Sequence, residues 1–280
     1  MRTVTVLTTL VLAIGIANAG VLFTVESTTH DETPARVQSN LMSIHGNHLK
    51  ISTLDPKDGK TVAGNEEVVF HGGRNEMMMI DHANKSYFVM DEEMFKEVDK
   101  AMGDAQKQMA EALKNMSDEE RQALEQAQKM GVKIPGMPPA GTKSERQKPE
   151  LKKTKDSEEM AGYKCDRYEA FSNGKKVYEF WVTDWSNIEG GAEARGAFET
   201  MCGFMVQIKE TLSQGASADH FDMEMLPLEA VAEIDGFPVV TRSFENGELT
   251  SESILKSAKK SKMDPSAFDP PKGYKKKSVM

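Results

Sequence analysis

The sequence predicts an α+β protein built on a large, curved antiparallel sheet, a half-open β-barrel with covering helices. Short runs rich in Val, Ile, Phe and Thr alternate with turn residues near both ends of the chain. The pairs Asn173-Gly174 and Asn246-Gly247 supply the positive φ angles that two-residue hairpin turns require. Two amphipathic stripes with helical spacing interrupt the strands. A sheet of about nine or ten strands is too large to stay flat, so we expect it to curl over its apolar face.

Residues 1–19 have the pattern of a cleaved secretory signal peptide. Arg2 precedes an apolar run over residues 4–16, and Ala17-Asn18-Ala19 ends it with small residues. The run is shorter than the span of about 20 residues that a membrane helix needs. Gly20 follows the expected cut, so no cysteine is there to carry a lipid anchor. We therefore expect a periplasmic or secreted protein with no transmembrane anchor after cleavage.

The N-terminal part of the mature chain has the pattern of an antiparallel meander. Strands are predicted over residues 20–28, 36–44, 48–54, 66–71, 76–81 and 86–90, with turn residues between them.

The pattern changes at Asp91, where residues 92–115 place apolar side chains at spacings of three and four. Ser117 begins a capping box that predicts a second helix to about residue 130. Residues 131–159 are rich in Pro, Gly, Lys and Glu, which is typical of a mobile linker. We therefore expect residues 20–280 to form a single domain into which a helical arm and a linker, residues 91–159, are inserted.

The Asn173-Gly174 turn predicts a hairpin over residues 163–185 and fixes its register. With Ser172 opposite Lys175, one face carries Tyr178, Phe180 and Val182 together with Cys165, and Tyr168 shares the other face with Trp181. The helix predicted over residues 192–212 places Cys202 on its apolar stripe. Both cysteines therefore point inward, where they form either a disulfide or two separate buried thiols. Further strands are predicted over residues 230–234, 239–244 and 249–259.

Charge and motifs exclude several functions. The formal net charge of −9 is unsuited to nucleic acid, whose phosphates require a basic surface. The sequence has no G-x-S-x-G elbow, H-E-x-x-H pair, phosphate-binding glycine loop or C-x-x-C pair. We therefore expect a monomeric protein that is not an enzyme and needs no cofactor.

Several short segments resemble bacterial secreted proteins of the domain-of-unknown-function family 4412. These segments are residues 79–81, 85–87, 161–165, 174–177, 181–185 and 268–274. That family is similar to the lipoprotein carriers LolA and LolB, in which a curved antiparallel sheet surrounds an apolar cavity under a helical lid. The resemblance implies a periplasmic carrier whose partner is a hydrophobic small molecule, a lipid or a lipoprotein.

The apolar side chains of the predicted sheet and helix are the candidate lining of such a cavity. Nineteen methionines add adaptable apolar surface, which suits an irregular cavity. The alternative is that these side chains fill a core, as in a structural or interaction protein. The candidate ligand-cavity residues are Phe23, Phe70, Met78, Phe88, Tyr178, Phe180, Val182, Phe198 and Met205.

A second candidate function is the binding of a soft metal ion, copper, in the cell envelope. Thioether and imidazole ligands suit copper. On a strand, however, Met78 points away from its two methionine neighbours. The candidate ligands are His45, His48, His71, Met77 and Met79.

Overall fold

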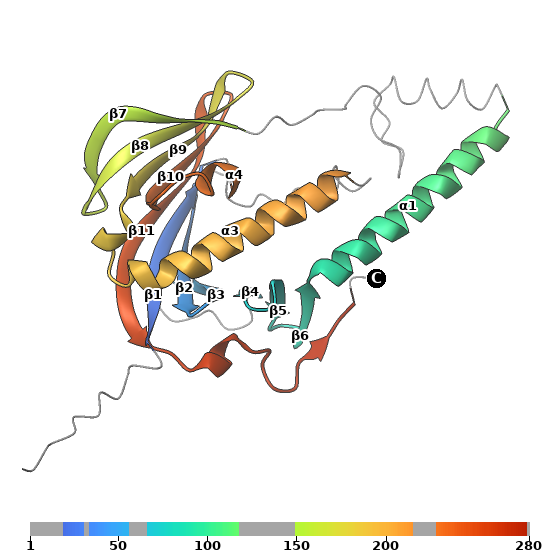
Figure 1. The fold of residues 1–280 in the computed structure, drawn as a ribbon, viewed down its shortest axis with the longest axis horizontal. Coiled ribbons are helices and arrows are strands. Elements are labelled where there is room, and N and C mark those ends of the chain that lie inside the picture. Colours follow the sequence, from blue (N-terminus) through green and yellow to red (C-terminus); the bar gives the residue numbers. More distant parts are fainter. Residues whose placement is uncertain (1–18, 31–33, 56–65, 118–148, 215–227, 279–280) are drawn as a thin grey trace, which may run out of the picture.

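The computed structural model describes residues 19–30, 34–55, 66–117, 149–214 and 228–278, which form one curved sheet with helices on its inner side (Figure 1). The first half of the sheet is an antiparallel meander. Its strands are β1 (Ala19–Thr29), β2 (Arg36–His45), β3 (His48–Leu54), β4 (Glu66–His71), β5 (Glu76–Asp81) and β6 (Ser86–Met90).

The second half comes from the C-terminal part of the chain and joins the first half through β1. Its strands are β7 (Glu150–Met160), β8 (Tyr163–Ser172), β9 (Lys175–Thr183), β10 (Phe237–Glu245) and β11 (Glu248–Lys262). The short strand β12 (Lys275–Lys276) pairs in parallel with β6. The order of the 12-stranded sheet is β12-β6-β5-β4-β3-β2-β1-β11-β10-β9-β8-β7. The sheet is curved, mostly antiparallel and unclosed, so the predicted half-barrel is confirmed.

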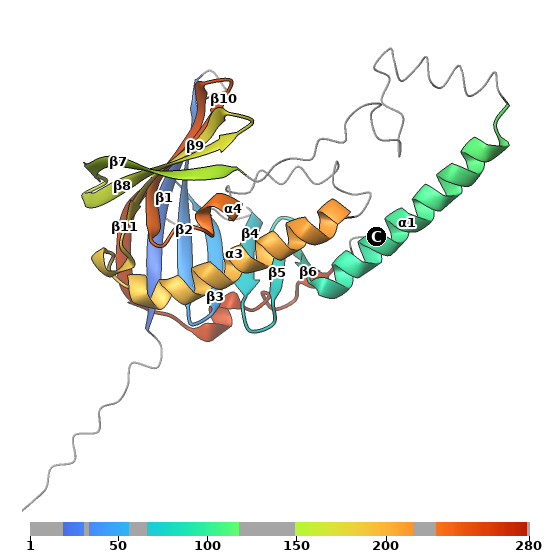
Figure 2. The ribbon, with the colours of Figure 1, turned by 45° about the horizontal axis from the view of Figure 1, so that its top comes forward.

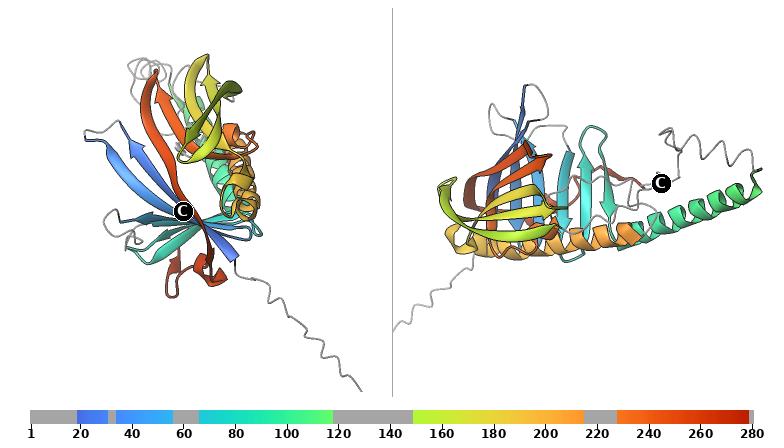
Figure 3. Two further views of the ribbon diagram at one scale, coloured as in Figure 1. Left: turned by 90° about the vertical axis from the view of Figure 1, so that its left-hand side faces the viewer. Right: turned by 90° about the horizontal axis from the view of Figure 1, so that it is seen from above.

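Helix α3 (Gly191–Gln214) runs along the inside of the curve, with the one-turn helix α4 (Leu228–Val231) beside it (Figures 2 and 3). Gly190 leads into α3 with φ +76°, and a Cβ there would collide with Val21. Helix α1 (Glu92–Asn115) follows β6 and projects away from the sheet (Figure 1). The carboxylate of Asp91 caps its first turn by accepting a hydrogen bond from the backbone N–H of Met94 at 2.8 Å.

Most predicted elements lie where the patterns place them. All six N-terminal strands, the hairpin β8–β9 and the helices α1 and α3 are confirmed. Asn173 and Gly174 have φ angles of 52° and 74°, and Asn246 and Gly247 have 52° and 88°, as two-residue hairpin turns require. The predicted signal peptide, apart from Ala19 at the start of β1, lies outside the described residues. So does the second predicted helix beyond Ser117.

Three predictions were wrong. Residues 230–234 do not form a strand, because Leu228–Val231 is helical and its apolar side chains pack beside α3. The predicted linker does not reach residue 159, because β7 begins at Glu150. Tyr168 lies opposite Phe180 rather than beside Trp181, because a bulge between Ala170 and Phe171 shifts the hairpin register.

The C-terminal segment crosses the outer face of the first half of the sheet. A 3₁₀ turn, Pro265–Phe268, places the buried Phe268 against Val69, Met78 and Ile80 of β4 and β5. Farther along, the hydroxyl of Tyr274 and Nδ1 of His82 are 2.9 Å apart. None of the helices in the described ranges is long and apolar enough to cross a membrane.

Candidate functional site

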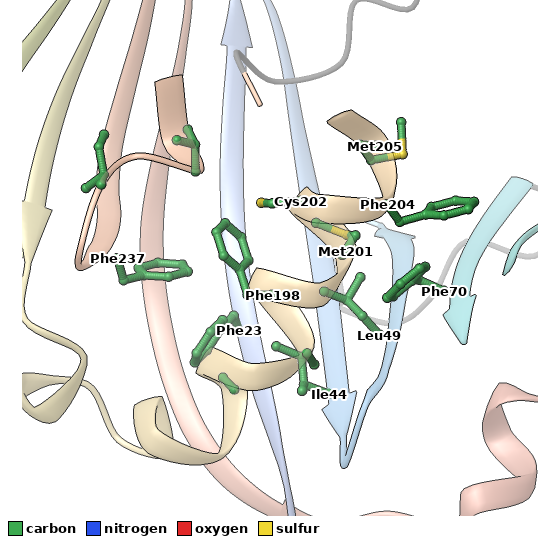
Figure 4. Close-up of a cluster of buried hydrophobic side chains, with 14 of the residues drawn as sticks. Phe23, Ile44, Leu49, Phe70, Phe198, Met201, Cys202, Phe204, Met205 and Phe237 are labelled. Carbon is green, nitrogen blue, oxygen red and sulfur yellow. The ribbon is translucent and has the colours of Figure 1, made fainter. Parts of the chain in front are cut away.

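The inner face of the first half-sheet carries a row of buried apolar side chains, over which α3 packs on β1, β2 and β3 and α1 packs on β6. The row crosses six strands in register, one residue from each of β1 to β6, and each member is at most 3% exposed. Figure 4 shows Ile44, Leu49 and Phe70 beneath the side chains of α3, and the rings of Phe70 and Phe204 have centroids 5.4 Å apart. This covered row consists of Val21, Ile44, Leu49, Phe70, Met77 and Met90.

A second apolar row lies next to the covered row on the same face, two residues along each strand. It starts at the buried Phe23 and continues through five side chains that are only half-buried. All five pack against the core that α3 completes. We call these five residues the apolar strip. They are Met42, Ile51, Val68, Met79 and Phe88.

The third row on this face is polar. Asn40 lies opposite Thr53, and Glu66 lies opposite Asp81. The Thr53 hydroxyl and the Asn40 side-chain oxygen are 3.4 Å apart, and Gln38 donates to that same oxygen at 2.9 Å. Asn40, Thr53, Glu66 and Asp81 form a polar rim. The apolar strip is therefore bordered by α3 on one side and by hydrogen-bonding groups on the other.

The dimensions of the strip follow from strand spacing. Five neighbouring strands, at about 4.8 Å between strands, extend over about 19 Å. This length is comparable to that of an extended long-chain acyl group. Because a half-buried apolar strip of this length exposes hydrocarbon to water, it is the kind of surface that binds an apolar partner.

The structure divides the predicted cavity residues into three groups. Phe88 belongs to the apolar strip, and Tyr178 is half-buried on β9, where its ring stacks on that of Phe180. Met78 is on the outer face with Phe268, so its assignment to the same cavity as Phe88 was wrong. The others are at most 6% exposed and belong to the main hydrophobic core. They are Phe23, Phe70, Phe180, Val182, Phe198 and Met205.

Sequence reasoning missed three members of the strip: Met42, Ile51 and Val68. It proposed the fourth, Met79, only as a metal ligand. The available signal was the cross-strand register, because each of these residues lies directly opposite the next across β2 to β5. Most of the predicted cavity residues are aromatic, and most of these aromatic side chains are buried in the core.

Two of the pockets on the described surface lie elsewhere. One, of about 350 Å³, adjoins the β10–β11 turn around Asn246. The other, of about 390 Å³, lies on the outer face between Lys50, Glu67 and the C-terminal segment. Neither is lined by residues of the apolar strip.

The predicted copper ligands do not come together as one set. Met77 and Met79 belong to the inner face, where they pack in or against the main core. His45 and His48 have ring centroids 6.3 and 5.6 Å from that of Phe268, on the outer face, and His48 contacts His71 there. In the part of the chain that the structure describes, no three side chains of His, Cys, Asp or Glu are placed to share one metal ion.

Both cysteines are free, buried thiols, so the disulfide alternative is not formed. Cys165 Sγ donates to the backbone carbonyl of Tyr163 at 3.3 Å. Burial raises the pKa of the Cys165 thiol to about 11 and that of the Cys202 thiol to about 12. Both are therefore protonated and unreactive near neutral pH.

No protein-family model and no curated protein matches this sequence. The resemblance to the domain-of-unknown-function family 4412 thus has no support from a family model.

Similar solved structures have low identity to this chain. An uncharacterized conserved protein from Thermus thermophilus has TM-score 0.42 at 6% identity, over 94% of this chain and 91% of that one. The MucA/MucB complex of Pseudomonas aeruginosa has TM-score 0.35 at 9% identity, and the match spans 91% of this chain and 56% of that one. A putative outer membrane lipoprotein-sorting protein domain from Vibrio parahaemolyticus has TM-score 0.30 at 8% identity, over 91% of both chains. All three TM-scores are below 0.5, and likenesses this weak say nothing about function.

Proposed function

We propose that this protein is a non-enzymatic carrier or binding protein for a hydrophobic ligand, an acyl chain, a lipid or a lipoprotein. The observation that carries the proposal is the apolar strip, five half-buried side chains in register beside α3. The ligand lies along the strip, across the strands, with its hydrocarbon against Ile51 and Val68. Its polar part contacts the rim at Asn40 and Thr53.

The strip is a half-buried surface rather than an enclosed cavity. The covered row is filled by α3, so the ligand does not enter the core beneath that helix. The competing function is a structural or interaction protein whose apolar side chains only fill a core. The two functions can be distinguished by ligand affinity, because only a binding protein would bind an acyl chain through the apolar strip.

A fluorescent long-chain acyl probe tests the proposal. Wild-type protein is expected to bind it saturably, and Val68→Glu is expected to weaken binding by about 10-fold or more, because a carboxylate then lies within the apolar strip. Val37→Glu is the matched control, since Val37 is 56% exposed and alternates to the other face of β2. Equal affinity of Val68→Glu and wild type, or no saturable binding by wild type, would contradict the proposal.

We further propose that the protein acts in the periplasm, as a monomer, after removal of residues 1–19. The sequence pattern of a signal peptide supports this location. Cleavage after Ala19 would leave all of β1 except its first residue in place. N-terminal analysis of the protein recovered from its native compartment is expected to give Gly20 as the first residue. A retained N-terminus would contradict the proposal.

A further inference from the structure

Five exposed lysines gather at the edge of the sheet where β12 pairs with β6 (Figure 1). The pairing places Lys275 opposite Ser86. The backbone N–H of Lys277 donates to the carbonyl of Tyr87 at 2.7 Å. Lys85 ends the turn before β6, and its carbonyl accepts a hydrogen bond from the N–H of Lys275 at 3.0 Å. We call this group of lysines the basic edge. It consists of Lys85, Lys272, Lys275, Lys276 and Lys277.

The backbone that carries the basic edge is held in place and is not a loose tail. Phe268, which is 1% exposed, anchors the C-terminal segment by packing against β4 and β5. The hydroxyl of Tyr274 and Nδ1 of His82 are 2.9 Å apart, which ties the segment to the turn between β5 and β6. The N–H of Tyr274 also donates to the carbonyl of Pro271 at 3.1 Å. The lysines therefore project from defined positions along the sheet edge.

The positive charge at this edge has little local compensation. Residues 270–278 contain four lysines and no acidic residue, although the whole chain has a formal net charge of −9. In the part of the chain that the structure describes, none of the five lysines forms an ion pair. Lys277 acts on Asp81, but the carboxylate of Asp81 already accepts hydrogen bonds from the backbone N–H and Nδ2 of Asn84, at 2.9 and 2.6 Å. The basic edge is therefore available to an external anion.

Lysine on an edge strand can also serve to prevent pairing with another chain. That role accounts for Lys275 and Lys276, which form β12. It does not account for Lys85, which is in a turn, or for Lys272, which precedes the strand. The concentration of positive charge thus extends beyond the edge strand, and this favours a binding role for the whole group.

We propose that the basic edge docks the protein on an anionic lipid membrane surface. Clusters of about four to eight Lys or Arg side chains are attracted to anionic headgroups. The acidic remainder of the protein is repelled by the same headgroups, so electrostatics turns this edge toward the bilayer. The contact is peripheral, because lysine ammonium groups stay at the level of the headgroups.

Docking in this orientation brings one end of the apolar strip to the membrane. Phe88, the last member of the strip, is on β6, the strand that pairs with β12. A ligand whose polar part contacts Asn40 has its hydrocarbon end nearest the bilayer, so it enters the membrane tail first. This consequence rests on the proposed function, whereas the docking itself does not.

Co-sedimentation with lipid vesicles tests the docking on protein recovered from its native compartment. Wild type is expected to bind vesicles of equal parts phosphatidylglycerol and phosphatidylcholine, but not vesicles of phosphatidylcholine alone. Salt at about 1 M, where the Debye length is about 3 Å, should release it. A variant with four lysines of the basic edge replaced by glutamine should bind at least about 30-fold more weakly. This variant is K272Q/K275Q/K276Q/K277Q.

The matched control removes the same number of positive charges from exposed positions on β7, β8 and β9, and it should bind nearly as wild type does. This control is K152Q/K155Q/K164Q/K175Q. Labelling of wild type with an amine-reactive reagent locates the contact without any variant. Anionic vesicles should protect Lys275 and Lys277 from the reagent and leave Lys152 and Lys164 reactive.

The docking proposal would be overturned by equal binding to phosphatidylcholine vesicles, by no binding to the anionic vesicles, or by binding that salt does not weaken. It would also be overturned by an equal loss in the two quadruple variants, by no loss in the basic-edge variant, or by unprotected Lys275 and Lys277. Loss of acyl-probe binding alone, with docking retained, would count against the proposed function and not against the docking.

Discussion

Arg242 on β10 donates a hydrogen bond from Nη1 to Oε1 of Glu179 on β9 at 2.9 Å, although Glu179 is only 5% exposed. Trp181 Nε1 and Lys176 Nζ also donate to this carboxylate, each at 3.1 Å. Burial by itself would raise the pKa of Glu179. The hydrogen bonds from Lys176, Arg242 and Trp181 outweigh burial and lower that pKa below 4.5.

Glu179→Gln is expected to lower the free energy of unfolding by about 1–3 kcal/mol at pH 7, because it removes a charged acceptor from three donors. A carboxylate with a lowered folded-state pKa stabilises the protein above its unfolded pKa, and this contribution is lost as the pH falls. The difference between variant and wild type should therefore shrink below about pH 4. Urea unfolding of both proteins at several pH values measures this difference in unfolding free energy. Glu248→Gln, at the exposed first residue of β11, serves as control, and a pH-independent difference would contradict the expectation.

Substitutions of Leu49 and Ile51 on β3 should distinguish an effect on stability from an effect on ligand binding. Leu49 belongs to the covered row and Ile51 to the apolar strip, on the same face of the same strand. Leu49→Ala is expected to cost about 2–4 kcal/mol. Ile51→Ala should cost less and should weaken binding of the acyl probe more. Unfolding curves and probe titrations on both variants check this, and a larger loss of affinity for Leu49→Ala would contradict the assignment of the strip.

Much of the fold could be predicted from the sequence, because local patterns determine it. Alternation places β3, β4, β5 and β6 at their observed bounds, and Asn-Gly pairs specify both hairpin turns. The strand β7 could not be predicted, since eight of its eleven residues are exposed at the sheet edge and carry no apolar alternation. The bulge after Ala170 has no signal of its own, so the faces of β8 were assigned wrongly.

The site was predicted less well than the fold, for a physical reason. Whether an inward-facing residue is covered or half-exposed depends on where α3 crosses the sheet, which the strand pattern does not contain. Phe70 and Val68 are both inward-facing on β4, yet only Val68 reaches the strip. Likewise, the pairing of His48 with His71 depends on the register of β3 and β4.

Two glycines, one at the entry to α3 and one within it, are expected to change the stability in opposite directions when replaced by alanine. Gly190→Ala should destabilise the protein by about 2 kcal/mol or more, because φ is +76° and the new Cβ collides with Val21. Gly203→Ala lies within α3 with open space around it, and it should stabilise by up to about 1 kcal/mol. Thermal unfolding of the two variants compares them directly. A Gly190→Ala variant as stable as wild type would contradict the close contact between Gly190 and Val21 at the start of the helix.

The burial of Cys165 and Cys202 predicts how fast their thiols react. Native protein near pH 7 should react slowly with a thiol reagent, because burial raises the pKa of Cys165 to about 11 and that of Cys202 to about 12. Denatured protein, prepared without reductant, should give two reactive thiols. A count of none under those conditions would show that the two cysteines form a disulfide.

Phe268→Ala is expected to release the C-terminal segment from the outer face while the sheet persists. The backbone N–H groups of Lys275 and Lys277 donate to the carbonyls of Lys85 and Tyr87 at 3.0 and 2.7 Å. Without the buried Phe268 ring these amides should exchange with solvent faster. Hydrogen exchange measures them individually, with the amides of the β1–β11 pair as control. Unchanged protection of Lys275 would contradict the role assigned to Phe268.

The pairing of β1 with β11 also sets the order in which the molecule can assemble. Ala19 is opposite Lys262, so the two halves of the sheet join through strands that are far apart in the sequence. A chain emerging from the ribosome can form the meander early, but β1 lacks its second neighbour until β11 has been synthesised. Contacts of such large sequence separation slow folding. Until then β1 lacks the neighbour that joins the two halves, and the chain cannot complete its sheet.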